Sequence, residues 1–391
     1  MSKTAINKHR KPKDSGVAPH RSPPVWRVDL AAQYQVYARE IEDAVARVLR
    51  SGRYVLGPEG EAFEREFAAY LRAPHVIGVS NGTSAITMAL KALGVKAGSE
   101  VITTPFTAVP TIGAIIEAGA VPVFVDIDPD TWLIDCELAA AAINERTSAI
   151  VPVHMFGNVV DIPGLRRRLP RSLPIVEDAA QAHGSRLHDR MAGTLGDLAT
   201  FSFYPTKNLG CYGDGGAIVA NDHELAQRLR MMRNHGMQDK DTCLEAGTNS
   251  RLDELQAAIL RAKLPHLDEM NAARQHLCQV YLERLPPDLF IPQRATAGAQ
   301  VNIHLLQLRF RGKRDELAEF LASHGIQTNV YYAIPHHLQP AFARLGYRPG
   351  DLPEIERLCK ESIALPLYPE MSLEVIERVT DAIRKFSRPG S

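Results

Sequence analysis

Short apolar runs alternate along most of the chain with segments of helical periodicity. Runs typical of strands lie at 75–79, 100–104, 122–127, 149–153, 175–177 and 199–203. Between them, apolar residues recur every three or four positions, for example at 109–117 and 162–169, which predicts helices. Strands that are apolar on both faces and alternate with helices are typical of a largely parallel, helix-covered sheet. The pattern predicts an α/β fold.

Both ends of the chain depart from this alternation. Residues 1–25 are polar and carry prolines and a basic cluster at 8–13, which predicts a disordered tail. Two helices are expected at 38–49 and 58–71, and Asn249-Ser250-Arg251 should open a long helix, since such residues cap helices. Beyond residue 263, a strand at 302–310 and helices at 314–323 and from 372 predict a smaller α+β domain. We therefore divide the chain into a tail (1–25), a large domain with its N-terminal helix (26–262) and a small domain (263–391).

Composition narrows the range of partners and locations. The 391 residues include 45 basic and 45 acidic ones, so no net charge favours nucleic acid, which the tail's basic cluster alone supports weakly. The apolar region 108–125 is broken by Pro110, Glu117 and Pro122, as expected of a helix and a strand rather than a membrane span. Five scattered cysteines without CxxC spacing suit a reducing cytosol and argue against disulfides or a structural zinc. We expect a cytoplasmic protein with no signal peptide, no membrane contact and no metal site.

The stretch 201–210 presents one lysine, Lys207, between two apolar strands. A lysine on an exposed loop would be the ordinary interpretation. A lysine buried between strands has a lowered pKa, and such an amine can form a Schiff base. The choice between these two interpretations depends on what lies near Lys207.

Two more polar features follow apolar strands of the same predicted sheet. Asp178 ends the strand at 175–177, and the turn at Gly82-Thr83 leads from a strand into a helix, offering free N–H groups to an anion. Each alone would be a helix cap or a salt-bridge partner. Together with Lys207, they supply what pyridoxal 5′-phosphate needs: an amine for the aldehyde, a carboxylate for the pyridine nitrogen and donors for the phosphate. No GxGxxG or Walker motif supports another nucleotide fold.

These features and others in the same order resemble the DegT/DnrJ/StrS family of sugar aminotransferases. The likeness runs from about residue 28 to 384 and implies the type I pyridoxal-phosphate fold. The matching segments are 80–85, 125–128, 177–184, 201–207, 213–216, 233–236, 247–251 and 332–337.

The resemblance implies a role for each matched residue. Lys207 would carry the cofactor and move the substrate proton, and Asp178 would pair with the pyridine nitrogen. Gln181 would bind the ring 3′-oxygen. The phosphate would be held by Gly82, Thr83 and Ser202, and by Asn249 of the other protomer, which implies an obligate homodimer. Tyr332 and His337 correspond to substrate-side positions, where a packing role is equally favoured. The same choice between function and packing applies to His183, His235 and Arg251.

The family's activity is transfer of an amino group from glutamate, giving 2-oxoglutarate, to a keto sugar carried on a nucleotide. We expect this activity here. Relatives with histidine at the lysine position are sugar dehydratases, and Lys207 argues against that class. Two further classes stay open: an enzyme that acts on a cyclitol or forms an aminobenzoate, and a regulator without catalysis. Ala108 stands where many relatives carry an aromatic residue against the cofactor ring, so either a small residue covers that face here or another aromatic residue, such as Phe106 or Tyr204, does so.

Overall fold

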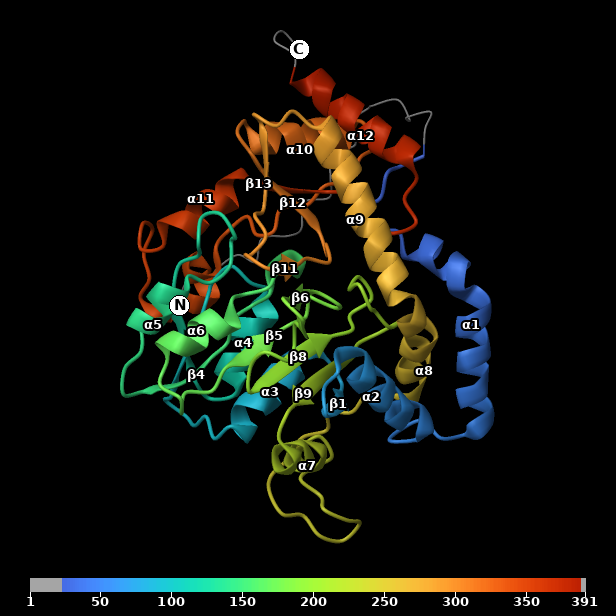
Figure 1. The fold of residues 1–391 in the computed structure, drawn as a ribbon, viewed down its shortest axis with the longest axis vertical. Coiled ribbons are helices and arrows are strands. Elements are labelled where there is room, and N and C mark those ends of the chain that lie inside the picture. The colour runs from blue at the N-terminus through green and yellow to red at the C-terminus, as the bar shows by residue number, and fades with distance from the viewer. Residues whose placement is uncertain (1–22, 388–391) are drawn as a thin grey trace, which may run out of the picture.

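The computed structural model describes residues 23–387 (Figure 1). The basic cluster at 8–13 lies outside the described residues. Of the predicted tail, only 23–25 are described, and Val25 is buried, with its N–H donating to the Gly325 carbonyl at 2.8 Å. No described helix is both long and apolar enough to cross a membrane.

A central sheet organises the larger part of the chain. Its strands run in the order β3-β2-β4 and β5-β8-β9-β1, and parallel bridges from Ile150 to Ile175 and from Val153 to Asp178 join the two halves. All neighbours are parallel except β9, which is antiparallel to β1 and β8. The strands are β1 (His75–Val79), β2 (Glu100–Thr103), β3 (Val121–Phe124), β4 (Thr147–Ile150), β5 (Val176–Asp178), β8 (Leu198–Ser202) and β9 (Gly216–Ala220).

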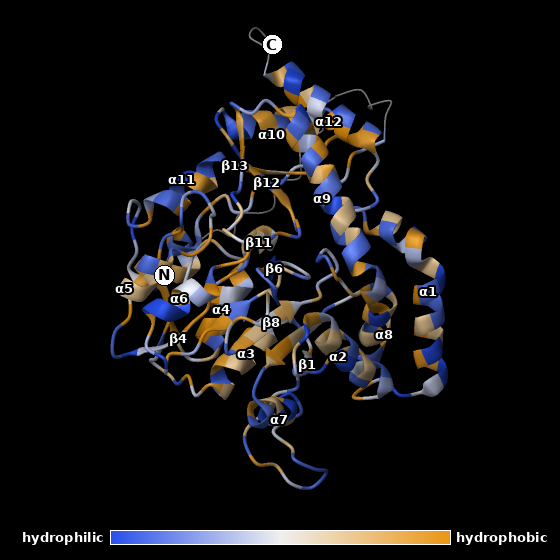
Figure 2. Ribbon diagram, viewed as in Figure 1, coloured by the Kyte–Doolittle hydropathy of each residue, from blue (hydrophilic) through white to orange (hydrophobic). Residues whose placement is uncertain are grey.

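Helices cover both faces of this sheet, whose strands are strongly apolar (Figure 2). On one face, α3 (Gly82–Ala92), α4 (Val109–Glu117) and α7 (His223–Met232) share a core with Ile77 and Ile218. On the other face, α2 (Pro58–Leu71) and α8 (Glu254–Lys263) pack on Val76 and Val219. The alternation of 76 with 77 along β1 follows from the two-residue repeat of a strand. The remaining helices of this part are α1 (Leu30–Ser51), which packs on α8, and α5 (Cys136–Ala141) and α6 (Ile162–Arg168), which pack on each other.

The C-terminal part has its own antiparallel sheet and core. Helix α9 (Leu267–Arg284) continues the line of α8 after a short 3-10 turn and leads to this part (Figure 1). The sheet, in the order β10-β12-β13, shares its core with α10 (Arg314–Ser323) and α12 (Leu373–Phe386). Helix α11 (Pro353–Glu361) directs its buried apolar side chains into a core shared with β2, β3 and β4. Its strands are β10 (Phe290–Pro292), β12 (Leu306–Phe310) and β13 (Ser362–Leu365). A further sheet joins β11 (Ala299–Gln300) to β6 (Arg186–Leu187) and β7 (Arg190–Met191), so the chain's two parts meet there.

Two predicted elements begin later than expected. Helix α8 starts at Glu254 after Asp253, since the Ser250 hydroxyl is used on Ser80 and Asn249 pairs with Asn234 in a short bridge. Strand β12 starts at Leu306, not at 302. Residues 302–305 instead contact the large sheet's loops, as described below.

Candidate active site

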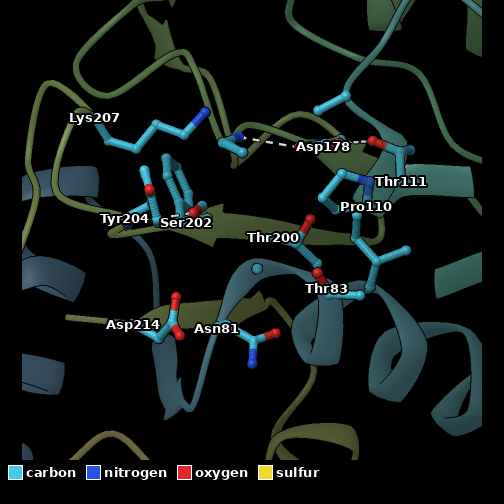
Figure 3. Close-up of a pocket in the computed structure, with 15 residues that line it drawn as sticks. Asn81, Thr83, Pro110, Thr111, Asp178, Thr200, Ser202, Tyr204, Lys207 and Asp214 are labelled. Carbon is cyan, nitrogen blue, oxygen red and sulfur yellow. Dashed lines mark hydrogen bonds between the residues drawn. The ribbon is translucent and has the colours of Figure 1, made fainter. Parts of the chain in front are cut away.

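A cavity of about 320 Å³ opens where β1, β5 and β8 end (Figure 3). This is within the size range of small-molecule sites, roughly 300–1,000 Å³. Carboxyl ends of parallel strands are where α/β sheets form their sites. The cavity is lined by Asn81, Gly82, Thr83, Ile86, Ala108, Pro110, Thr111, Asp178, Ala180, Thr200, Phe201, Ser202, Tyr204, Lys207 and Asp214.

The two carboxylates that end β5 point to opposite faces of the sheet, as neighbours on a strand must. Glu177 is fully buried and accepts hydrogen bonds from His154 Nε2 at 2.8 Å and from the N–H groups of Gly193, Leu195 and Gly196. Asp178 faces the cavity. Glu177 therefore stabilises a loop, and Asp178 is available for chemistry.

Asp178 is held by one side chain and one N–H group. Its Oδ2 accepts from the Thr111 hydroxyl at 2.8 Å, and its Oδ1 accepts from the Ala180 N–H at 3.1 Å (Figure 3). The Thr111 hydroxyl has one proton and donates it to the carboxylate. In the 2.7 Å contact between the hydroxyls of Thr107 and Thr111, Thr107 must therefore be the donor. Each carboxylate oxygen keeps room for a further donor.

Lys207 reaches into the cavity from the loop after β8, with its amino group directed toward the side of Asp178 (Figure 3). The side chain is half-buried, and the amine donates no hydrogen bond to another described residue. Burial lowers the pKa of Lys207 to about 8, against the opposing effect of the Asp178 charge. At neutral pH a larger fraction of this amine is uncharged than in an ordinary lysine, which makes it a better nucleophile.

The beginning of α3 forms an anion site at the floor of the cavity. Asn81 caps the helix by accepting from the Ser84 N–H at 2.8 Å, whereas the N–H groups of Gly82 and Thr83 have no partner among the described residues. A Cβ added to Gly82 would lie 2.9 Å from Cβ of Ser202. Glycine therefore lets the helix end approach Ser202 closely, and the free donors and helix dipole suit a phosphate.

Gln181 and Tyr332 lie beside the Asp178 end of the site without lining the cavity. The Gln181 Oε1 accepts from the Phe156 N–H at 2.9 Å. Burial is the main cause that raises the pKa of Tyr332, a nearby Asp178 charge adds to it, and a hydrogen bond with Gln181 opposes it. Tyr332 also packs edge-on against Phe106.

Two predicted site residues lie away from the cavity of their own chain. Asn249 is exposed, on the strand bridge to Asn234. His337 is buried, with Nε2 3.3 Å from Oε1 of Glu356. Their predicted roles therefore stay predictions.

His183, Arg251 and His235, which the sequence assigned to either function or packing, also have structural partners. His183 is fully buried between Phe201 and Phe203, and burial lowers its pKa to about 3. Arg251 donates to Oδ1 of Asn234 at 3.0 Å. The N–H of His235 donates to the Thr248 carbonyl.

Sequence reasoning missed Thr111 and Thr200 as cavity residues. Thr111 carried a signal: it is a polar residue in the first turn of an otherwise apolar helix, four residues after Thr107. Of the two aromatic residues considered for the ring face, Tyr204 lines the same cavity as Ala108, whereas Phe106 is buried and does not line it.

The donor set fits pyridoxal 5′-phosphate: a partly neutral amine and a carboxylate lie above an anion site that a Cβ at residue 82 would obstruct. With six parallel strands and β9 reversed, the fold is that of the type I pyridoxal-phosphate aminotransferases. Comparison with known proteins identifies the family. Residues 35–384 match the DegT/DnrJ/EryC1/StrS aminotransferase family, and the chain belongs to it.

Curated relatives cover nearly the whole chain. A pleiotropic regulatory protein from Geobacillus stearothermophilus is 46% identical over 92% of this chain and 98% of its own. A dTDP-3-amino-3,4,6-trideoxy-alpha-D-glucose transaminase from Streptomyces venezuelae is 44% identical over 94% and 97%. Nucleotide-sugar transaminases and a named regulator thus both occur among the relatives.

Solved structures show the same fold. DesV from S. venezuelae has a TM-score of 0.91 and 43% identity, over 95% of this chain and all of its own. NtdA from Bacillus subtilis, solved with bound cofactor PMP, has a TM-score of 0.87 and 31% identity, over 93% and 85%. The predictions of family, fold class and aminotransferase class are confirmed.

Proposed function

We propose that this chain binds pyridoxal 5′-phosphate in the described cavity and transfers an amino group from glutamate to a nucleotide-linked keto sugar. The observation that carries the proposal is the arrangement of Lys207 and Asp178 above the free N–H groups of α3. The sugar transaminases among the relatives support the substrate class.

Each residue has a distinct task in this proposal. The cofactor, when bound, supplies an electron sink for proton loss from the carbon that bears the amino group. Lys207 holds the cofactor and moves that proton, and Asp178 keeps the pyridine nitrogen protonated by its charge. Gly82, Thr83 and Ser202 bind the phosphate, and Gln181 binds the ring 3′-oxygen.

The site is proposed to be completed by a second copy of the chain. Tyr204, which lines the cavity, is 53% exposed, and Val109, next to Ala108, is 50% exposed. Exposed apolar side chains beside a site favour a protein partner. Asn249 would reach the phosphate of the other protomer, which accounts for its position outside its own cavity.

A regulatory role without catalysis is the second candidate, and the named regulator among the relatives favours it. The retention of both Lys207 and Asp178 favours the enzyme. The experiment is incubation of the purified protein and cofactor with glutamate and a panel of nucleotide-linked 3-keto and 4-keto hexoses, with products identified by mass spectrometry and NMR. An amino sugar formed by the native protein, and not by Lys207→Ala, is expected. No product from any sugar would overturn the proposal and favour the regulator.

A further inference from the structure

Asn208, directly after Lys207, is buried and fully engaged through its side chain. It is 1% exposed. Its Nδ2 donates to Oδ1 of Asn271 at 2.8 Å and to the Ile303 carbonyl at 3.3 Å, and its Oδ1 lies 2.9 Å from Nδ1 of His304. None of these three partners belongs to the central sheet or to the helices that cover it.

Backbone carbonyls fix the direction of every hydrogen bond in this cluster. The Ile303 carbonyl can only accept, so the Asn208 atom facing it is the amide nitrogen. Likewise, Asn271 directs Nδ2 to the His183 carbonyl at 3.0 Å, which leaves its Oδ1 for Asn208. The Asn208 oxygen then requires a donor, so His304 carries its proton on Nδ1. Burial lowers the pKa of His304 well below its ordinary value, which keeps this imidazole neutral.

The partners are themselves anchored. Asn271 lies in the first half of α9, the helix that leads to the C-terminal part (Figure 1). His304 precedes β12, and its N–H donates to the Phe156 carbonyl at 3.0 Å. Residues 302–305 were expected to begin a strand, but they bend to contact the large sheet's loops instead. The contact is therefore built by both parts of the chain.

The same loop has a second anchor, two residues after Asn208. Lys263, fully buried at the end of α8, donates to the Gly210 carbonyl at 2.5 Å and to Oε1 of Gln33 at 2.6 Å. A Cβ on Gly210 would lie 2.5 Å from the Pro205 carbonyl oxygen, so the loop is a tight turn. The turn is held from one side by α8 and α9.

We infer that Asn208 is a positioning residue, which fixes the reach of Lys207 into the cavity by clamping its loop to α9 and to the segment before β12. This inference rests on the proposed role of Lys207. Asn208 does not line the cavity, so it acts on the site only through its neighbour Lys207. The C-terminal part thereby contributes to the placement of the amine without contacting it.

The clamp has a measurable consequence for Lys207. The low pKa of this amine comes from burial, which requires the loop to stay in place. A loosened loop lets the amine reach water, and its pKa then rises toward its ordinary value. A purely structural role for Asn208 would lower stability and leave the pKa of the folded protein unchanged.

The test is competitive labelling of the cofactor-free protein by an amine-reactive anhydride between about pH 6 and 11, a range that brackets the folded and ordinary lysine pKa values, with the Lys207 peptide quantified by mass spectrometry. In Asn208→Ala, the apparent pKa of Lys207 should rise by about one pH unit, a tenfold change in its acid dissociation constant. Asn271→Ala removes the same clamp from the other side and should shift it in the same direction. The double variant should add little, because both changes break one contact.

Asn144→Ala, which removes an exposed asparagine side chain, is the control for the substitution itself. Its Nδ2 donates to Glu100 at 2.7 Å, at the start of β2, whereas the cavity lies where strands end, and the pKa of Lys207 should not change. An unchanged pKa in a folded Asn208→Ala protein, or an equal rise in the control, would overturn the inference. If Asn208→Ala does not fold, Asn271→Ala alone decides. Full turnover in Lys207→Ala would instead reject the proposed function and leave the clamp result standing.

Discussion

At the scale of single residues, the Asp178 carboxylate is held by a hydrogen bond from the Thr111 hydroxyl. Thr111 donates to the carboxylate, and Thr107 donates to Thr111. Hydrogen bonds to a charged acceptor are roughly twice as strong as neutral ones. Thr111 therefore holds the Asp178 carboxylate in place at the cavity.

Thr111→Val keeps the shape of the side chain and removes its hydroxyl. We expect about 1.5 kcal/mol of cofactor affinity to be lost, roughly tenfold in the dissociation constant, as for a hydrogen bond to a charged group. Asp178→Asn should lower turnover by more than about tenfold, or about 1.4 kcal/mol. In the Asp178→Asn background, Thr111→Val should cost clearly less, measured by cofactor titration. Additive losses would contradict the link between the two residues.

In the cofactor-free protein, the buried amine of Lys207 should lower the free energy of unfolding. Its pKa is about 8 in the folded state against 10.5 in the unfolded chain, so between these values the unfolded state binds more protons and stability rises with pH. Lys207→Met should therefore unfold with a free energy up to about 3 kcal/mol higher at about pH 7, a difference that shrinks above about pH 8 and vanishes near about pH 10.5. Denaturant unfolding across this range measures it. The exposed Lys360→Met is the control, and a difference that is constant with pH would contradict the expected burial of the charge.

At the scale of elements, the order of the main strands and helices up to α8, and of β12, α10 and α12, could be predicted because apolar periodicity is a local property. The elements β10, α11 and β13 were not predicted. The α4 and α10 bounds agree with the structure residue for residue. The turn after β1 was expected at Gly82-Thr83, but α3 already begins at Gly82. The first residues of β12 and α8 could not be predicted, because the partners that hold the preceding segments are distant in sequence. Asn208 holds His304 in the segment 302–305, and Ser80 holds Ser250 in the segment 249–251. Thr111 was missed for the same reason: its partner Asp178 lies 67 residues away.

The close contact of α3 with β8 gives a prediction for Gly82→Ala. The new Cβ would lie 2.9 Å from that of Ser202, so the helix start must move away from the strand end. We expect the free energy of unfolding to fall by about 1–3 kcal/mol, the usual cost of overpacking, and cofactor affinity to fall as well, because the displaced helix start carries the N–H groups of the phosphate site. Gly113→Ala, in α4 with open space around the added atom, is the control and should leave affinity unchanged. Equal affinities for the two variants would exclude the phosphate site.

At the scale of the whole molecule, the residues of the site lie at the carboxyl ends of the large sheet's strands and in the segments that follow them, and the C-terminal part supports two of its loops. Asn271 and the 302–305 segment contact the loops after β5 and β8. The resemblance supplied the roles of Lys207 and Asp178, whose placement in one cavity agrees with them. It did not supply the contacts between the two parts, because these depend on packing.

The proposed shared site predicts complementation between two inactive chains. A Lys207→Ala chain and an Asn249→Ala chain would form one composite site with both lesions and one with neither. Purified heterodimers should recover up to about half of wild-type activity, by site counting in a two-fold dimer. Asn249→Ala homodimers, which must be clearly impaired, are the reference. Heterodimers no more active than that reference would place Asn249 in its own chain's pocket.

The most direct test of the proposed active site is to find which lysine carries the cofactor. The protein is loaded with pyridoxal 5′-phosphate, reduced with borohydride and digested, and the modified peptide is sequenced by mass spectrometry. Lys263 is the informative comparison, because burial also lowers its pKa to about 8, while its amine is engaged by Gln33 and Gly210. The added mass is expected on Lys207 alone. Its presence on Lys263 or another lysine, with Lys207 unmodified, would contradict the assignment of the active site.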